Sequence, residues 1–89
     1  MRAIVTVIGK DSVGIIAGVC RLLADNGVNV LDISQTVLQG YFTMIMLVDT
    51  ADCQVAFDEL TRILARSGEE KNLSIRIQRE DIFEAMHRI

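Results

Sequence analysis

The chain has 89 residues, enough for one small domain with one modest core, so we expect a single domain over residues 1–89. Hydrophobic residues make up 51% of it and proline is absent, which predicts a folded chain and excludes a disordered one. The formal net charge of -3 leaves no basic excess to neutralise a phosphate backbone, so nucleic acid is not an expected partner.

The sequence predicts a soluble, cytoplasmic protein that does not enter a membrane. The apolar stretch after Met1 and Arg2 is broken at Thr6 and Gly9, too early for a signal peptide or a spanning helix. Cys20 and Cys53 lie far apart and do not form the spacing of a disulfide framework. His87 is the only histidine and has no second ligand at metal spacing, so we expect neither a metal nor a cofactor.

The first part of the chain predicts a strand followed by a helix. Residues 2–9 are rich in isoleucine and valine, which suit a strand, and they end at a glycine. From Val13 onward the apolar residues recur every three or four positions, as on one face of a helix: Ile16, Val19, Cys20 and Leu23. The helix is expected to end at Asn26–Gly27, because either residue adopts a left-handed C-terminal conformation readily.

The second part predicts a hairpin, a helix and a last strand. Residues 28–38 and 41–49 read as antiparallel strands joined by a tight turn at Gln39–Gly40. Asp52 is expected to cap a second helix that Gly68 closes, with an apolar stripe of Phe57, Leu60 and Leu64. Residues 73–78 alternate between apolar and polar side chains, as expected of a strand at the edge of a sheet.

This order of elements predicts an α+β fold, a ferredoxin-like βαββαβ sandwich. Right-handed crossovers interleave the two halves into a four-stranded antiparallel sheet of order 4-1-3-2, with both helices on one face. Ile4 and Ile8 place apolar side chains on the other face, so something should cover part of it. The candidates are a partner subunit and a short C-terminal helix with a stripe of Ile82, Phe83, Met86 and Ile89.

The loop from Gly9 to Gly14 is the strongest candidate for a binding site. Gly9 permits a tight exit from the strand, Asp11 or Ser12 can cap the helix, and Gly14 lets a ligand approach the backbone. Free N–H groups and the helix dipole there suit a carboxylate. The alternative is that both glycines serve only the turn and close packing. No base, nucleophile or metal has a positioned partner, so we expect no enzyme activity.

Several motifs resemble the ACT domain, a small regulatory module of amino-acid metabolism, along essentially the whole chain. They are Gly-Lys-Asp-Ser-Val-Gly-Ile-Ile at residues 9–16, Asn-Gly-Val-Asn-Val at 26–30 and Asp-Ile at 32–33. Further segments, at residues 32–37, 41–44 and 82–86, are similar to the free-standing group called UPF0237. The chain also resembles the N-terminal module of formyltetrahydrofolate deformylases and the glycine-cleavage repressor.

The resemblance implies a homodimer that binds an amino acid where the first loop of one subunit meets the second strand of its neighbour. Asp11 would then hold the ligand amino group, and Asn29 would reach across the interface, although it also suits an ordinary strand start. The other residues implied at the site are Ser12, the backbone N–H groups of Val13, Gly14 and Ile15, and Asp32 and Ile33. Val13 stands where many members have proline, which leaves the loop less rigid. The rival function is an assembly module that binds a protein partner and no ligand.

Overall fold

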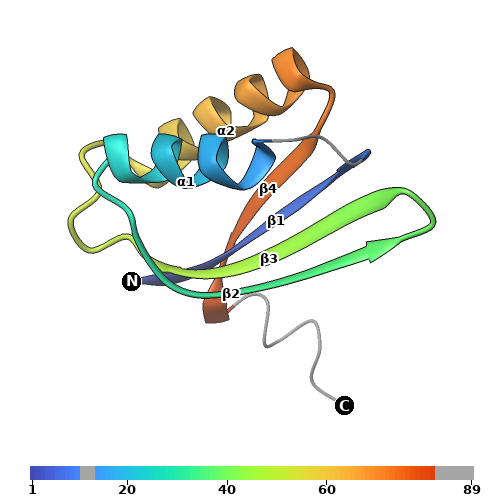
Figure 1. The fold of residues 1–89 in the computed structure, drawn as a ribbon. Coiled ribbons are helices and arrows are strands. Elements are labelled where there is room, and N and C mark those ends of the chain that lie inside the picture. Colours follow the sequence, from blue (N-terminus) through green and yellow to red (C-terminus); the bar gives the residue numbers. More distant parts are fainter. Residues whose placement is uncertain (11–13, 82–89) are drawn as a thin grey trace.

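The chain folds into a four-stranded antiparallel sheet with two helices on one face (Figure 1). The structure is a computed structural model, and it describes residues 1–10 and 14–81. The elements follow one another as β1 (Arg2–Lys10), α1 (Ile15–Asp25), β2 (Asn29–Leu38), β3 (Tyr41–Asp49), α2 (Phe57–Lys71) and β4 (Ser74–Arg79). The sheet order β2-β3-β1-β4 confirms the predicted order 4-1-3-2 and the ferredoxin-like fold.

The register of the sheet places β1 and β3 at its centre. Arg2 lies opposite Asp49 and Lys10 opposite Tyr41, so the two central strands pair along their full length. The turn between β2 and β3 was predicted correctly: Gln39 and Gly40 have φ values of 50° and 84°, the left-handed pair that suits a two-residue hairpin. β2 carries one extra residue between Val30 and Asp32, a β-bulge that the sequence pattern did not predict.

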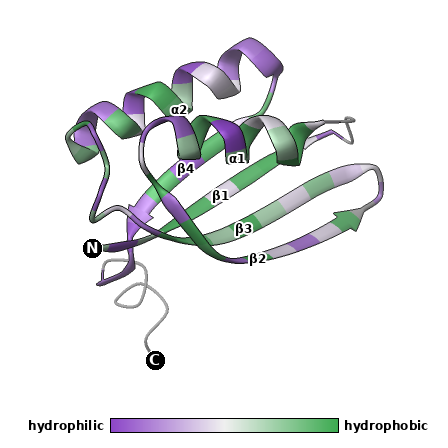
Figure 2. Cartoon of the chain, turned by 60° about the vertical axis from the view of Figure 1, so that its left-hand side comes forward, coloured by the Kyte–Doolittle hydropathy of each residue, from purple (hydrophilic) through white to green (hydrophobic). Residues whose placement is uncertain are grey.

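The hydrophobic core lies between the helices and the sheet face beneath them, where Figure 2 shows hydrophobic segments on β1 and β3. Apolar residues that alternate along the central strands supply the sheet side, and the helix stripes supply the other. The largest fully buried side chains are Val5, Val7, Val19, Leu23, Met44, Met46, Val48, Leu60 and Leu64. The predicted stripes are confirmed at Val19, Leu23, Leu60 and Leu64, while Ile16, Cys20 and Phe57 are partly buried against the core. Ile15, which the predicted stripe did not include, is also buried.

The prediction that Asp52 caps the second helix is wrong. α2 begins at Phe57, its N-cap is Ala56, and no side chain caps it. Contacts with the α1–β2 turn keep the preceding loop out of helical conformation: the Gln54 N–H donates to the Asn26 carbonyl oxygen at 2.9 Å. Asp58 and Glu59 in the first turn place negative charge near the positive end of the helix dipole instead.

The prediction that Gly68 closes the second helix is also wrong. The helix continues to Lys71 and ends at Asn72, whose φ of 58° is left-handed. Gly68 is buried, and a Cβ there would lie 2.6 Å from the Leu73 carbonyl oxygen. Glycine therefore lets α2 approach the chain that enters β4, which is a packing requirement and not a stop signal.

The sheet face away from the helices carries exposed apolar residues, as the sequence predicted. Ile8 is 45% exposed and Ile45 is 43% exposed, while Ile4 and Leu47 are half-buried. After β4 the backbone turns into helical conformation at Glu80 and Asp81. The remainder of the predicted C-terminal helix, with Ile82, Phe83, Met86 and Ile89, lies outside the described residues.

Candidate ligand site at the first loop and the β2 edge

Gly14 opens α1 and is an exposed residue of the candidate loop. Its φ of 88° is left-handed, and a Cβ built there meets no described residue within 4 Å. Its carbonyl oxygen accepts the Gly18 N–H at 2.9 Å, the first hydrogen bond of the helix. The backbone conformation alone therefore requires glycine, and the described residues leave room beside Gly14.

The other loop residues fall into two groups. Ile15 is 7% exposed, so its side chain belongs to the core, and its predicted role at the ligand depends on its backbone N–H alone. Asp11, Ser12 and Val13 lie outside the described residues, and their predicted roles at the ligand stay predictions.

The strand residues of the predicted site lie on β2 and do not share one face. Asn29 pairs with Asp49 and Asp32 with Leu47, on the side of the sheet away from the helices. Ile33 pairs with Met46, a core residue, and is 40% exposed on the helix side. Asp32 also accepts the Ile33 N–H at 2.9 Å through its Oδ1.

Within one chain, the first loop and Asn29 lie at opposite ends of the sheet. The loop follows Lys10, which pairs with Tyr41, whereas Asn29 pairs with Asp49 at the far end of β3. The two positions are eight residue steps apart along β3, on the order of 27 Å at about 3.4 Å per residue. One chain alone therefore does not bring the predicted site residues together.

β2 is an open edge of the sheet with apolar side chains along it. Leu31, Ile33 and Val37 are 47%, 40% and 60% exposed. The resemblance named Ile33 as a site residue, whereas Leu31 and Val37 were not singled out, and the bulge beside Leu31 interrupts the alternation of the strand. An exposed apolar edge of ten residues is a template for pairing with another strand.

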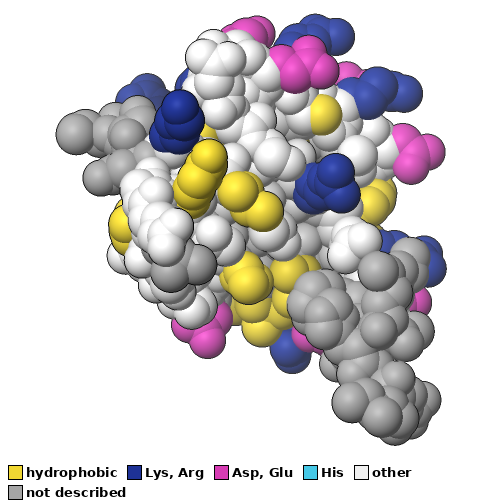
Figure 3. Space-filling model, turned by 90° about the vertical axis from the view of Figure 1, so that its right-hand side faces the viewer, with side chains coloured by type: hydrophobic (Ala, Val, Ile, Leu, Met, Phe, Trp, Pro, Cys, Tyr) yellow, Lys and Arg dark blue, Asp and Glu magenta, His cyan; other side chains and the backbone are white. Residues whose placement is uncertain are grey.

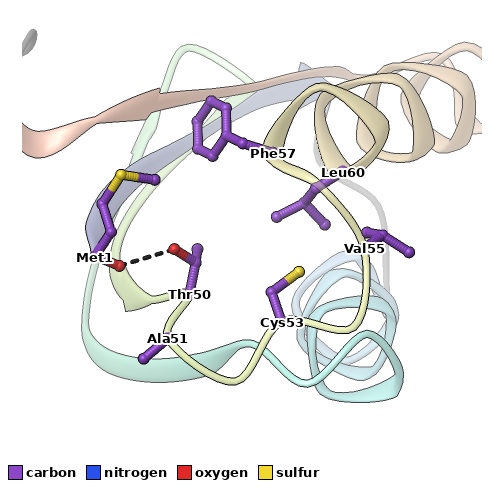
Figure 4. A pocket seen from close by; sticks show the side chains of 7 residues that line it. All are labelled: Met1, Thr50, Ala51, Cys53, Val55, Phe57 and Leu60. Atoms are coloured by element: carbon purple, nitrogen blue, oxygen red, sulfur yellow. Dashed lines mark hydrogen bonds between the residues drawn. The ribbon is translucent and has the colours of Figure 1, made fainter.

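Two hollows that the sequence did not predict flank the sheet. One, of about 300 Å³, lies at the N-terminus and is lined by Met1, Thr50, Ala51, Cys53, Val55, Phe57 and Leu60 (Figure 4). The Thr50 N–H and hydroxyl both donate to the Met1 carbonyl oxygen, at 2.8 and 2.9 Å, which closes one side of it. Its lining side chains are mainly apolar, so it offers no pair of groups for acid–base chemistry.

The second hollow, of about 610 Å³, lies next to the first loop. Its lining includes two lysines, Lys10 and Lys71, together with Ile8, Gly9, Tyr41, Asn72 and Leu73. The two ammonium groups make this end of the molecule favourable for an anion.

Ionisable groups with shifted pKa values have structural causes. The Ala51 N–H donates to Asp49 Oδ1 at 2.9 Å, and with the N-terminal ammonium at 3.5 Å it lowers the pKa of Asp49. The hydrogen bond from Arg62 to Glu59 raises the pKa of Arg62.

Among residues 1–10 and 14–81, no group of three or more His, Cys, Asp or Glu side chains is arranged to hold a metal ion. No helix within those ranges has the length and hydropathy needed to cross a membrane.

The chain matches known proteins along its whole length. A family model described as ACT domain matches residues 2–78. A UPF0237 protein of Clostridium acetobutylicum is 54% identical over 89 residues and one of Listeria monocytogenes is 52% identical over 89, each match covering 100% of both chains. The solved ACT domain protein of Streptococcus pneumoniae superposes with a TM-score of 0.83 at 46% identity, covering 94% of each chain.

Two larger solved proteins contain a similar fold. A formyltetrahydrofolate deformylase of Pseudomonas syringae matches with a TM-score of 0.79 at 23% identity, over 88% of this chain and 27% of that one. A protein described as a glycine cleavage system transcriptional repressor matches with a TM-score of 0.70 at 25% identity, over 86% and 44%. Both resemblances that the sequence indicated are therefore confirmed.

Proposed function

The chain belongs to the ACT domain family, within its UPF0237 group, and we propose that it is a cytoplasmic, homodimeric amino-acid sensor. A small regulatory, ligand-binding domain is what this family membership supports. The proposal adds the dimer, the amino acid and its place between the two subunits. It assigns no enzyme activity to the chain. It places the protein in the reducing cytoplasm, which agrees with Cys20 and Cys53 being free thiols.

The observation that carries the proposal is the separation of the first loop from Asn29 within one chain. Two copies that pair antiparallel along β2 remove this separation, because a two-fold axis places the start of one strand beside the end of the other. With the axis between Ile33 and Ser34, Asn29 of one copy faces Leu38 of the other, at the loop end of the sheet. The open apolar edge of β2 favours such a pairing.

The chemistry of the loop end suits the two groups that all amino acids share. The first-turn N–H groups beside Gly14 and the positive end of the α1 dipole favour a carboxylate. Lys10 adds positive charge at the strand end that leads into the loop. Asp11 is the proposed partner of the ligand ammonium group, and Asn29 of the second copy adds an amide.

A thermal-shift screen with the common amino acids at millimolar concentration tests the proposal. We expect at least one of them to raise the melting temperature, because a ligand that binds only the folded state stabilises it. Asp11→Ala and Asn29→Ala should each reduce that shift while the dimer persists, and Ser12→Ala is the matched control for loss of a helix cap. Gly14 is unsuitable for this purpose, because its φ of 88° makes any side chain strained and mixes folding with binding.

A second candidate function is an assembly module that binds a protein partner without a ligand. The exposed Ile8 and Ile45 on the face away from the helices favour it. If no amino acid shifts the wild-type melting temperature, or if Asp11→Ala and Asn29→Ala both keep the full response, the sensor is excluded and the assembly module takes its place.

A further inference from the structure

We propose that the chain's own C-terminal segment, residues 82–89, docks across the end of the sheet face that the helices leave open. The apolar patch that would receive it consists of Ile4 on β1 with Leu47 and Ile45 on β3, and we call it the lower patch. This inference is independent of the proposed ligand site.

The lower patch is built by two adjacent rows of the sheet. In the first row Gln78, Ile4, Leu47 and Asp32 lie side by side across the four strands. In the next row the sequence is Arg76, Thr6, Ile45 and Ser34. Ile4, Leu47 and Ile45 thus fill three of the four middle positions, Thr6 fills the fourth, and polar side chains stand at both margins. Figure 3 shows hydrophobic side chains gathered among charged ones. Such a patch suits an amphipathic element that crosses the central strands.

The chain leaves β4 at the margin of this patch and is held on the correct side of the sheet. Arg2 is two residues before Ile4, so its side chain lies on the face away from the helices. The Arg2 guanidinium contacts the Glu80 carboxylate at 2.7 Å, which draws the residue after β4 to that face. Glu80 and Asp81 are already helical, so a helix that continues from them starts beside the first row.

The length and pattern of the remaining segment match the lower patch. As a helix, the ten residues from Glu80 to Ile89 would span about 15 Å, and β3 lies two strand spacings, about 10 Å, from β4. The segment therefore reaches Leu47 and Ile45 but not the far end of the face near Tyr41. Its apolar residues recur at helical spacing and fit one side: Ile82, Phe83, Met86 and Ile89.

A cross-linking experiment in the full chain identifies the occupant of the patch. Cys20→Ala and Cys53→Ala first remove the two native thiols, and Ile45→Cys is then combined with Met86→Cys. After mild oxidation we expect a cross-link within one chain, seen at the monomer mass on a non-reducing denaturing gel. Tyr41→Cys with Met86→Cys is the control and should not cross-link, because Tyr41 lies four residues farther along β3, about 14 Å away.

Two results overturn the proposal. A cross-link at the dimer mass shows that a second copy's segment covers the patch, and a yield no higher than that of the control pair shows that nothing from this segment does.

A second measurement keeps the native cysteines, in case the thiol-free chain folds poorly. The chain has no tryptophan, so Phe83→Trp is a single reporter, and we expect it to be shielded from acrylamide quenching. Ile45→Asp should abolish that shielding and Tyr41→Asp should not; a reporter that is quenched freely in the parent variant contradicts the docking.

Discussion

The two edges of the sheet are built in opposite ways. β4 is a six-residue strand with Ile75 and Ile77 buried beneath α2, while Arg76 and Arg79 face solvent. β2 is a ten-residue strand along which Leu31, Ile33 and Val37 are exposed. Short length and exposed charge are the usual protection of an edge against further strands; β2 is long, and Asp32 is its one charged residue.

The difference indicates which edge is available for a partner. α2 packs closely on β4 because Gly68 allows the helix backbone to approach Leu73, so the inner side of this edge is filled. The apolar side chains of β2 are exposed instead, and burying them against a partner would stabilise the paired state. A homodimer should therefore form through β2 and leave β4 free.

The largest effect is expected from removing the close packing at β4. Gly68→Ala places a Cβ 2.6 Å from the Leu73 carbonyl oxygen, so α2 must move away from the strand. We expect a loss of about 1–3 kcal/mol in the free energy of unfolding, measured by urea denaturation.

Gly18→Ala is the matched control, because it makes the same change inside the other helix. Its Cβ meets only the Nζ of Lys71 at 3.2 Å, the end of a flexible side chain. That variant should be neutral or more stable by about 0.5–1 kcal/mol, since alanine favours helices. Equal losses in both variants would show that close packing on β4 is not the cause.

A smaller effect is expected from placing charge on the β2 edge. Ile33→Lys should weaken the dimer by about 10- to 100-fold, because an apolar contact is replaced by a charge that pairing must desolvate. The residue is already 40% exposed, so the monomer should keep its fold, as seen by circular dichroism. Light scattering across a dilution series measures the dissociation constant.

Ser74→Lys puts the same charge on β4 and should leave the dimer unchanged. If it dissociates the dimer while Ile33→Lys does not, the roles of the two edges are reversed. If wild-type protein is monomeric at micromolar concentration, neither edge supports the proposed assembly.

The smallest effect is expected between the edges, where Asp49 ends the central strand β3. The pKa of Asp49 is lowered in the folded chain by the Ala51 N–H and the N-terminal ammonium, so the unfolded state binds the proton more readily. Its stabilising contribution is present above the unfolded pKa of about 3.9 and is lost as the pH falls through the lower folded value. Asp49→Asn should therefore flatten the fall of melting temperature below about pH 4.

Asp52→Asn removes one negative charge from the neighbouring loop and controls for net charge. With Asp52→Asn, the melting temperature should still fall below about pH 4, and more steeply than with Asp49→Asn. Identical melting curves for the two variants would show that the specific contacts of Asp49 do not contribute.

The sequence alone predicted the elements whose signals are local. The helical spacing of Val19 and Leu23 and the left-handed turn at Gln39–Gly40 depend only on nearby residues, and both were located correctly. The order of strands followed from the order of elements, because crossovers have a preferred hand. The resemblance to the ACT family also rested on residues that stand close together in the chain.

Tertiary structure decided the features that involve distant segments. The start of α2 depends on a hydrogen bond from Gln54 to Asn26, and the burial of Gly68 depends on the path of the chain into β4. No local pattern distinguishes a glycine that ends a helix from one that packs against a strand. The bulge in β2 likewise shifted which residues are exposed on that edge.

The candidate site shows the same division most clearly. The resemblance implied a site shared by the first loop of one subunit and Asn29 of its neighbour, but the motifs alone did not give the distance between the two within one chain. The antiparallel register of β1, β2 and β3 determines that separation, because hydrogen bonding aligns residues that are far apart in the chain. Local chemistry thus selected the residues, and the geometry of the folded sheet decided that a single copy does not bring them together.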